Sequence, residues 1–162
     1  MDTTEILIQI RKIVRSVDIE SKKIQKEYGV SIPQVLCLSY LNTRSDYQAT
    51  HKSICDFLTL NSSTVTGIID RLEKKGLVAR LPKKDDKRNT YITITSKGSS
   101  LLESIPPLMH ERLSSKLEKL SEKEISNIIN SLDIIVDFLD VGGIDAAPVL
   151  TIEDDINKTE ND

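Results

Sequence analysis

Basic side chains are concentrated in residues 71–97 of this 162-residue chain. The segment carries nine Lys and Arg against three Asp and Glu, a net charge of +6, while the whole chain is −3 at pH 7 and the remainder therefore −9. A run of charge usually marks a solvated face. A single basic patch in an acidic protein is also typical of a surface that contacts a polyanion such as a nucleic-acid backbone.

Short hydroxyl side chains come directly before this basic segment, at Ser62, Ser63, Thr64 and Thr66. Ser and Thr are poor interior helix formers because they compete for backbone hydrogen bonds. They suit a helix end that must enter the DNA major groove, where short side chains reach base edges and phosphates. An ordinary first helical turn is the alternative interpretation.

The hydroxyl residues belong to a predicted helix that follows Asn61, a residue type that caps helix N-termini. Four aliphatic residues at spacing i, i+3, i+4 and i+7 predict one buried face of this helix. Gly76 suits the left-handed conformation that ends many helices. The four aliphatic residues are Val65, Ile68, Ile69 and Leu72.

Neighbouring segments complete a compact unit. A helix over about 52–58, with Thr50 as its candidate cap, comes before a three-residue turn at 59–61, the length expected in a helix-turn-helix. Residues 77–80 and 91–94 are β-like and flank a polar, basic loop. This order predicts a winged helix-turn-helix, a unit that reads DNA.

The same stretch resembles the MarR family of bacterial transcription regulators. The resemblance rests on Leu72-Glu73-x-x-Gly76-Leu77-Val78 after a Ser/Thr-rich helix, and on Asp86-x-Arg88-x-x-x-Ile92-x-Ile94-Thr95-x-x-Gly98. It covers roughly residues 5–140 and implies a homodimer that binds palindromic operators. It also implies that Asp86 stabilises the wing and that Arg88 reaches the minor groove, and an Asp two residues from an Arg can orient its guanidinium.

The candidate DNA-contacting residues follow from these patterns. The helix contributes hydroxyl groups and one arginine, and the wing contributes basic side chains. Lys74 and Lys75, in the last turn of the helix, either contact the backbone or stay solvated. The candidates are Ser62, Ser63, Thr64, Thr66, Arg71, Lys83, Lys84, Lys87 and Arg88.

Flanking helices carry long apolar stripes. We expect helices over 5–27, 32–42, 96–119 and 121–139, with Pro106-Pro107 kinking or breaking the third. Ser31 with Gln34, Thr95, and Ser121 with Glu124 are predicted N-caps. The first and last stripes predict a dimer seam, although an intramolecular bundle would also bury them. The predicted seam residues are Ile10, Ile13, Val17, Ile128, Leu132, Ile135 and Leu139.

The predicted fold is therefore mainly α with a small β wing. Residues 31–97 form the winged helix-turn-helix, and 5–30 and 98–140 form the dimerisation region. Residues 141–162 are acidic and expected to be disordered, although Ala146–Ile152 could dock as an extended arm. Cys37 and Cys55 are expected to be buried free thiols, and the two histidines, His51 and His110, form no cluster for zinc.

These features predict a cytoplasmic DNA-binding transcriptional regulator rather than an enzyme or a membrane protein. The chain has no apolar run of transmembrane length and no signal peptide pattern. We expect a repressor without a cofactor that binds double-stranded DNA as a homodimer, with a small effector near residues 11–21 and 39–44. The alternative is a winged-helix module that binds another protein, a use that this fold also serves.

Overall fold

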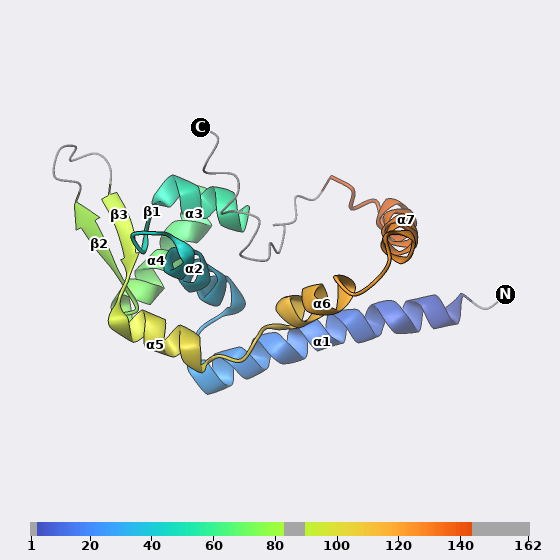
Figure 1. The fold of residues 1–162 in the computed structure, drawn as a ribbon, viewed down its shortest axis with the longest axis horizontal. Helices are drawn as coiled ribbons and strands as arrows, with labels where there is room; N and C mark the ends of the chain where they lie inside the picture. The colour runs from blue at the N-terminus through green and yellow to red at the C-terminus, as the bar shows by residue number, and fades with distance from the viewer. Residues whose placement is uncertain (1–2, 83–89, 144–162) are drawn as a thin grey trace. The chain divides into compact units, whose positions relative to one another are not determined.

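The computed structural model describes residues 3–82 and 90–143, and its described part is helical apart from one small sheet (Figure 1). The chain divides into two compact units, residues 1–108 and 109–162. The first contains α1 (Thr4–Tyr28), α2 (Ile32–Thr43), β1 (Gln48–Thr50), α3 (His51–Leu58), α4 (Ser62–Lys74), β2 (Val78–Pro82), β3 (Thr90–Ile94) and α5 (Ser96–Ser104). The second contains α6 (Met109–Leu117) and α7 (Glu122–Phe138).

Side-chain caps begin five of the helices, and all five were predicted from the sequence. Each capping oxygen accepts from the backbone N–H three residues later, which satisfies a donor that has no partner inside the helix. The caps of α2 and α7 are full capping boxes, with Gln34 or Glu124 accepting in return from the capping residue's own N–H. The capping residues are Ser31, Thr50, Asn61, Thr95 and Ser121.

The sheet is antiparallel, with β3 between β1 and β2. Ala49 of β1 lies opposite Ile92, and Arg80 of β2 lies opposite the same residue from the other side. Strand β1 did not emerge from the sequence, because three residues are too few to show an alternating pattern. Its last residue, Thr50, also caps α3, so the strand leads directly into the helix-turn-helix.

Aliphatic side chains from α2, α3, α4 and the sheet form one core. Val65, Ile68, Ile69 and Leu72 are all buried, which confirms the predicted inner face of α4. Gly98 lets α5 approach this core closely, because a Cβ added there would lie 2.2 Å from the carbonyl oxygen of Leu77. Only glycine therefore fits at this position of α5.

The predicted helix over 96–119 is two helices. α5 ends at Ser104 and α6 begins at Met109, so Pro106-Pro107 breaks the helix rather than bending it. The break also falls at the boundary between the two compact units.

The helices at either end of the chain keep their apolar stripes exposed. Ile24 is the one buried residue of α1, and α7 has none. Ile13 of α1 is 59% exposed and Leu132 of α7 is 50% exposed. None of the described helices is both long enough and apolar enough to span a bilayer.

Candidate nucleic-acid interface

The N-terminal half of α4 presents small polar side chains on the side opposite its buried face. Ser62, Ser63, Thr64 and Thr66 are all exposed, while the residues between and after them face the core. Thr59, in the turn before α4, has φ of +50°, a conformation rare for a β-branched residue. This tight turn sets the angle between α3 and α4, the pair that constitutes the helix-turn-helix.

Two of these hydroxyl groups already donate hydrogen bonds. Ser63 donates to Asn61 Oδ1 at 2.8 Å, and Thr66 donates to the carbonyl oxygen of Ser62 at 2.8 Å. His51 on α3 also reaches the outer face, with its Nε2 atom 3.0 Å from Thr66 Oγ1. The structure therefore brings the four predicted hydroxyl residues together and adds His51, which sequence reasoning missed.

The Arg71 side chain lies close to Gly67 on α4. The Arg71 guanidinium lies 3.8–4.0 Å from the place where a Cβ of residue 67 would be. Arg71 is exposed, and its contact with DNA stays a prediction.

Arg80 links the wing to α4. From β2, its Nη2 atom donates to Asp70 Oδ1 at 2.5 Å, and its Nη1 atom donates to Glu73 Oε2. The hydrogen bond to Asp70 raises the pKa of the Arg80 guanidinium, and the charges of Glu73 and Asp70 raise it further. Arg80 thus neutralises acids on α4, and its charge does not add to the basic surface counted from the sequence.

Two lysines of the basic segment donate hydrogen bonds to backbone carbonyl groups of the same chain. Lys75 donates to the carbonyl oxygen of Gly29, which ends α1, and Lys97 donates to the carbonyl oxygen of Lys75 at 2.7 Å. Cations suit the carbonyl end of a helix because that end carries partial negative charge. Lys75 is exposed, and its contact with DNA stays a prediction.

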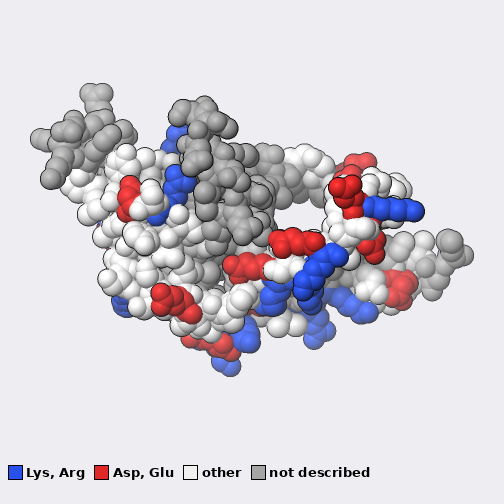
Figure 2. All heavy atoms as spheres, in the orientation of Figure 1, with Lys and Arg blue, Asp and Glu red and all other residues white. Residues whose placement is uncertain are grey.

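The wing tip, residues 83–89, lies outside the described residues. Lys83, Lys84, Lys87 and Arg88, together with Asp86, therefore stay predictions. Their flanking strands are paired up to Pro82 and Thr90, which confirms a hairpin around this loop. On the face drawn in Figure 2, the described acidic and basic side chains are interspersed rather than gathered into separate areas.

The two cysteines differ. Cys37 is fully buried, and burial raises the pKa of its thiol to about 12. Cys55 is only partly buried, so the expectation that both thiols are buried was wrong for this one, because α3 is a short helix at the surface. Burial and the charge of Asp56 raise the pKa of Cys55. Among the described residues, no three His, Cys, Asp or Glu are placed to hold a metal ion.

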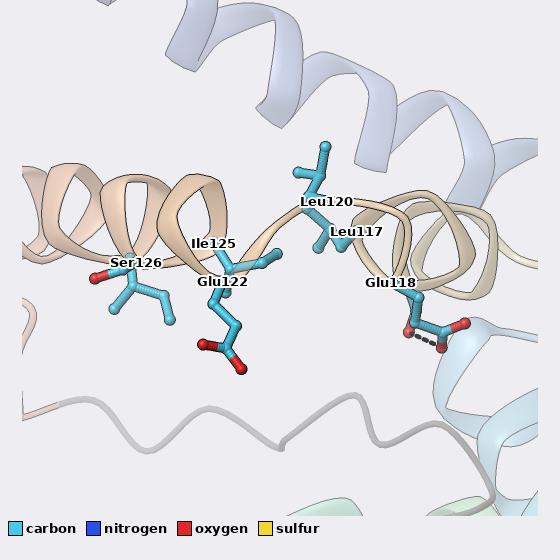
Figure 3. Close-up of a pocket in the computed structure, with 8 residues that line it drawn as sticks. Leu117, Glu118, Leu120, Glu122, Ile125 and Ser126 are labelled. Carbon is cyan, nitrogen blue, oxygen red and sulfur yellow. Dashed lines mark hydrogen bonds between the residues drawn. The ribbon is translucent and has the colours of Figure 1, made fainter.

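A separate hollow of about 640 Å³ lies between α6 and α7 (Figure 3). Leu117, Leu120, Ile125 and Ile129 contribute apolar groups to its lining, and Glu118 and Glu122 contribute carboxylates. Four aliphatic side chains facing one open hollow indicate a surface suited to apolar groups from elsewhere.

Comparisons with known proteins agree with this architecture. A sequence profile described as the MarR family matches residues 30–90. The HTH-type transcriptional regulator YkoM of Bacillus subtilis is 32% identical over 115 residues, which cover 71% of this chain and 73% of YkoM.

Solved structures show the same fold. The S. aureus MepR–DNA complex matches with a TM-score of 0.62 at 23% identity, covering 82% of this chain and 96% of that one. Bordetella bronchiseptica BpsR, whose DNA binding is regulated by 6-hydroxynicotinic acid, matches with a TM-score of 0.58 at 23% identity, covering 80% and 91%. With its helix-turn-helix, its paired wing strands and these relatives, the chain belongs to the MarR family of transcriptional regulators.

Proposed function

We propose that this protein is a sequence-specific transcriptional repressor that binds a palindromic operator as a homodimer and responds to a small effector. The observation that carries the proposal is the exposed face of α4, where small hydroxyl side chains and Gly67 replace the long side chains of an ordinary surface helix. Such a face allows the backbone to approach base edges in the major groove.

Charged residues around this face support DNA contact. Arg71 lies along α4, and Lys74 is exposed in its last turn. The free N–H groups at the start of α4 also favour an anion such as a phosphate. We assign base-edge and phosphate contacts to Ser62, Ser63, Thr64, Thr66 and Arg71. We assign the wing contacts to Lys83, Lys84, Lys87 and Arg88, and we propose that Asp86 orients Arg88.

The exposed stripes of α1 and α7 support a homodimer. Isolated apolar stripes of this length expose enough surface to favour association with a second copy. We assign the seam to the predicted residues Ile10, Ile13, Val17, Ile128, Leu132, Ile135 and Leu139, and the hollow between α6 and α7 to apolar side chains of the partner. Residues 5–30 and 98–140 then form the dimerisation region, and 31–97 the DNA-reading unit.

A small effector is suggested by a relative of known ligand. BpsR responds to 6-hydroxynicotinic acid, a small aromatic acid. We place the effector of this protein near residues 11–21 and 39–44, where the Arg44 guanidinium lies 5.5 Å from the Tyr40 ring centre. An aromatic ring with a cation beside it suits an aromatic acid.

Electrophoretic mobility shift with duplexes selected from a randomised library tests DNA binding. We expect nanomolar-range binding of a palindrome, with a log–log salt slope of about −5 to −9 because two subunits neutralise several phosphates each. Arg88→Ala should weaken operator binding by about 1–3 kcal/mol, and Lys83→Ala by less and equally on all sequences. If no duplex binds even at low salt, the proposal fails and a protein-binding module becomes the better explanation.

A further inference from the structure

Helices α1 and α7 carry opposite charges beside their exposed apolar stripes. Residues 6–17 of α1 contain three basic residues and no acid, a net charge of +3. Residues 125–140, which include most of α7, contain three acids and no basic residue, a net charge of −3. All six charged side chains are exposed, and they are Arg11, Lys12, Arg15, Asp133, Asp137 and Asp140.

Four of these side chains have no oppositely charged partner within the chain. Arg11 and Arg15 of α1, like Asp133 and Asp137 of α7, form no ion pair within residues 3–82 and 90–143. Charged residues beside an apolar seam are the groups that determine which helices pair and in which direction they run. The two pairs of opposite charge are therefore available to a partner outside the chain.

The two arginines lie on one side of the α1 stripe. An α-helix turns by about 100° per residue, so a step of four residues turns about 40° past a full turn. Leu7 is exposed at the edge of the stripe, Arg11 comes four residues after it, and Arg15 comes four residues later again. Both arginines are thus displaced from the stripe in the same rotational direction.

The two aspartates are displaced from the α7 stripe in the same direction. Ile129 is exposed at the edge of that stripe, and Asp133 and Asp137 follow it in two steps of four residues. Two helices that pack stripe to stripe bring the same sides together only when they run antiparallel, because turning a helix end over end exchanges its two sides. The opposite charges therefore meet in an antiparallel pair and not in a parallel one.

The apolar residues agree with the alignment that the charges require. Each charged pair is separated by four residues, so two ion pairs can form at once between antiparallel helices. The residues midway between the charges, Ile13 and Ile135, then lie level with each other. Both were predicted as seam residues from apolar spacing alone, which does not depend on the charges.

We propose that α1 of one copy packs antiparallel on α7 of a second copy, with Arg11 facing the partner's Asp137 and Arg15 facing the partner's Asp133. The inference rests on the homodimer of the proposed function. Two-fold symmetry repeats each contact, so four ion pairs border the seam. A chain that lacks either the basic side of α1 or the acidic side of α7 loses half of these pairs, so the charges select a second copy of this chain.

Charge reversal in the full chain tests this pairing. Arg11→Glu with Arg15→Glu places like charges on both sides of the seam, and Asp133→Lys with Asp137→Lys does the same. Each variant should dimerise about tenfold or more weakly, because four exposed pairs of modest strength become repulsive. Sedimentation equilibrium measures the dissociation constant of the dimer.

A control on the other side of α1 separates position from net charge. Lys12→Glu with Lys23→Glu changes the net charge by as much as the arginine reversal does, and both lysines are exposed. This variant should dimerise as tightly as the unmodified chain. An equal loss in the lysine and arginine variants would refute the pairing.

Mixing the two charge-reversed variants identifies the partner. In a heterodimer of the arginine variant with the aspartate variant, every reversed side again faces an opposite charge. The mixture should therefore dimerise about as tightly as the unmodified chain, although each variant alone does not. Pairing of α1 with α7 of the same chain would gain nothing from mixing.

Cross-linking tests the antiparallel direction. Both chains carry Cys55→Ala, and the remaining native thiol is buried. A chain with Arg11→Cys should be joined by a short bismaleimide to a second chain with Asp137→Cys. Gln9 lies four residues before Ile13, on the other side of the α1 stripe, so Gln9→Cys should react with the same partner only in a parallel pair.

The outcomes distinguish this inference from the proposed function. If the unmodified chain is a monomer, the proposed homodimer fails and this inference fails with it. If the chain is a dimer but mixing restores nothing, or the chain with Gln9→Cys is cross-linked in place of the one with Arg11→Cys, the proposed homodimer stands and the antiparallel pairing of α1 with α7 is refuted.

Discussion

Arg80 on β2 donates to Asp70 on α4 at 2.5 Å, and the same guanidinium donates to Glu73 one turn further along the helix. Asp70 and Glu73 lie on the helix that we propose reads DNA, where uncompensated carboxylates would repel phosphates. Arg80 thus joins β2 of the wing to α4 and neutralises the charges of Asp70 and Glu73.

Arg80→Ala should therefore reduce DNA binding more than stability. All three side chains are between 34% and 51% exposed, so solvent screens the pairs and the stability loss should be about 1 kcal/mol or less. The loss of DNA-binding free energy should be larger than this loss of stability, because two unpaired carboxylates then face the phosphates. Urea unfolding and mobility shift measure the two quantities.

Adding Asp70→Asn and Glu73→Gln to Arg80→Ala should restore DNA affinity without restoring stability. Lys119→Ala, which removes one positive charge from the other compact unit, is the control for net charge. If Lys119→Ala weakens binding as much as Arg80→Ala, the position of Arg80 has no special role.

Gly67→Ala should increase the stability of the fold but weaken DNA binding. The new Cβ would have only ordinary contacts, at 3.8 Å from the Arg71 guanidinium, and alanine favours a helix by about 0.5–1 kcal/mol over glycine. The added methyl group lies on the outer face of α4, so operator affinity should fall. A variant that binds its operator as well as the unmodified protein would show that this face does not approach DNA closely.

Gly98→Ala should be strongly destabilising. Its Cβ would lie 2.2 Å from the carbonyl oxygen of Leu77 and 2.8 Å from Ile94 Cγ1, so backbone must move. We expect a loss of about 3 kcal/mol or more, measured by urea unfolding. Gly142→Ala, whose nearest neighbour would be 4.0 Å away, should change stability little. Equal effects of the two substitutions would contradict the close approach of α5.

Cys37 should make stability fall at alkaline pH. Burial raises its pKa from 9.0 to about 12, so the folded state holds a proton that the unfolded state releases above pH 9. Its contribution is present in full below pH 9 and is lost as pH rises towards 12, by about 1.4 kcal/mol between pH 8 and 10. The difference in urea unfolding between the unmodified protein and Cys37→Ala isolates it, and Cys55→Ala is the control. If the free energy of unfolding has the same pH dependence in the unmodified protein and in Cys37→Ala, the thiol is not buried.

Leu132→Glu should dissociate the proposed dimer. A carboxylate within an apolar seam would be buried without a partner, at a cost of several kcal/mol. Operator binding should fall with it, because a single subunit reads only one half-site. Asn130→Glu, on another face of α7, is the matched control. Analytical ultracentrifugation measures both variants, and a dimeric Leu132→Glu that still binds a palindrome tightly would place the seam elsewhere.

The sequence predicted the local features of this fold and missed the long-range ones. N-caps such as Asn61 and the inner face of α4 follow from residue types a few positions apart, so a linear pattern contains them. The contact of Lys75 with Gly29 joins residues 46 apart, and that of Arg80 with Asp70 joins a strand to a helix. No spacing rule encodes such partners. The i, i+3 pair of acids Asp70 and Glu73 was the one hint that a cation faces α4.

The bond from Lys75 to Gly29 joins the C-terminal end of α1 to the C-terminal end of α4. With 25 residues, α1 is about 37 Å long, so a change of about 5° at Gly29 moves its far end by about 3 Å. α1 carries an exposed apolar stripe, which we propose binds a second copy of the chain. If it does, a shift of a few ångströms of α1 along that copy would rotate the end of α4. The orientation of α4 would then depend on how firmly the second copy binds the N-terminal part of α1.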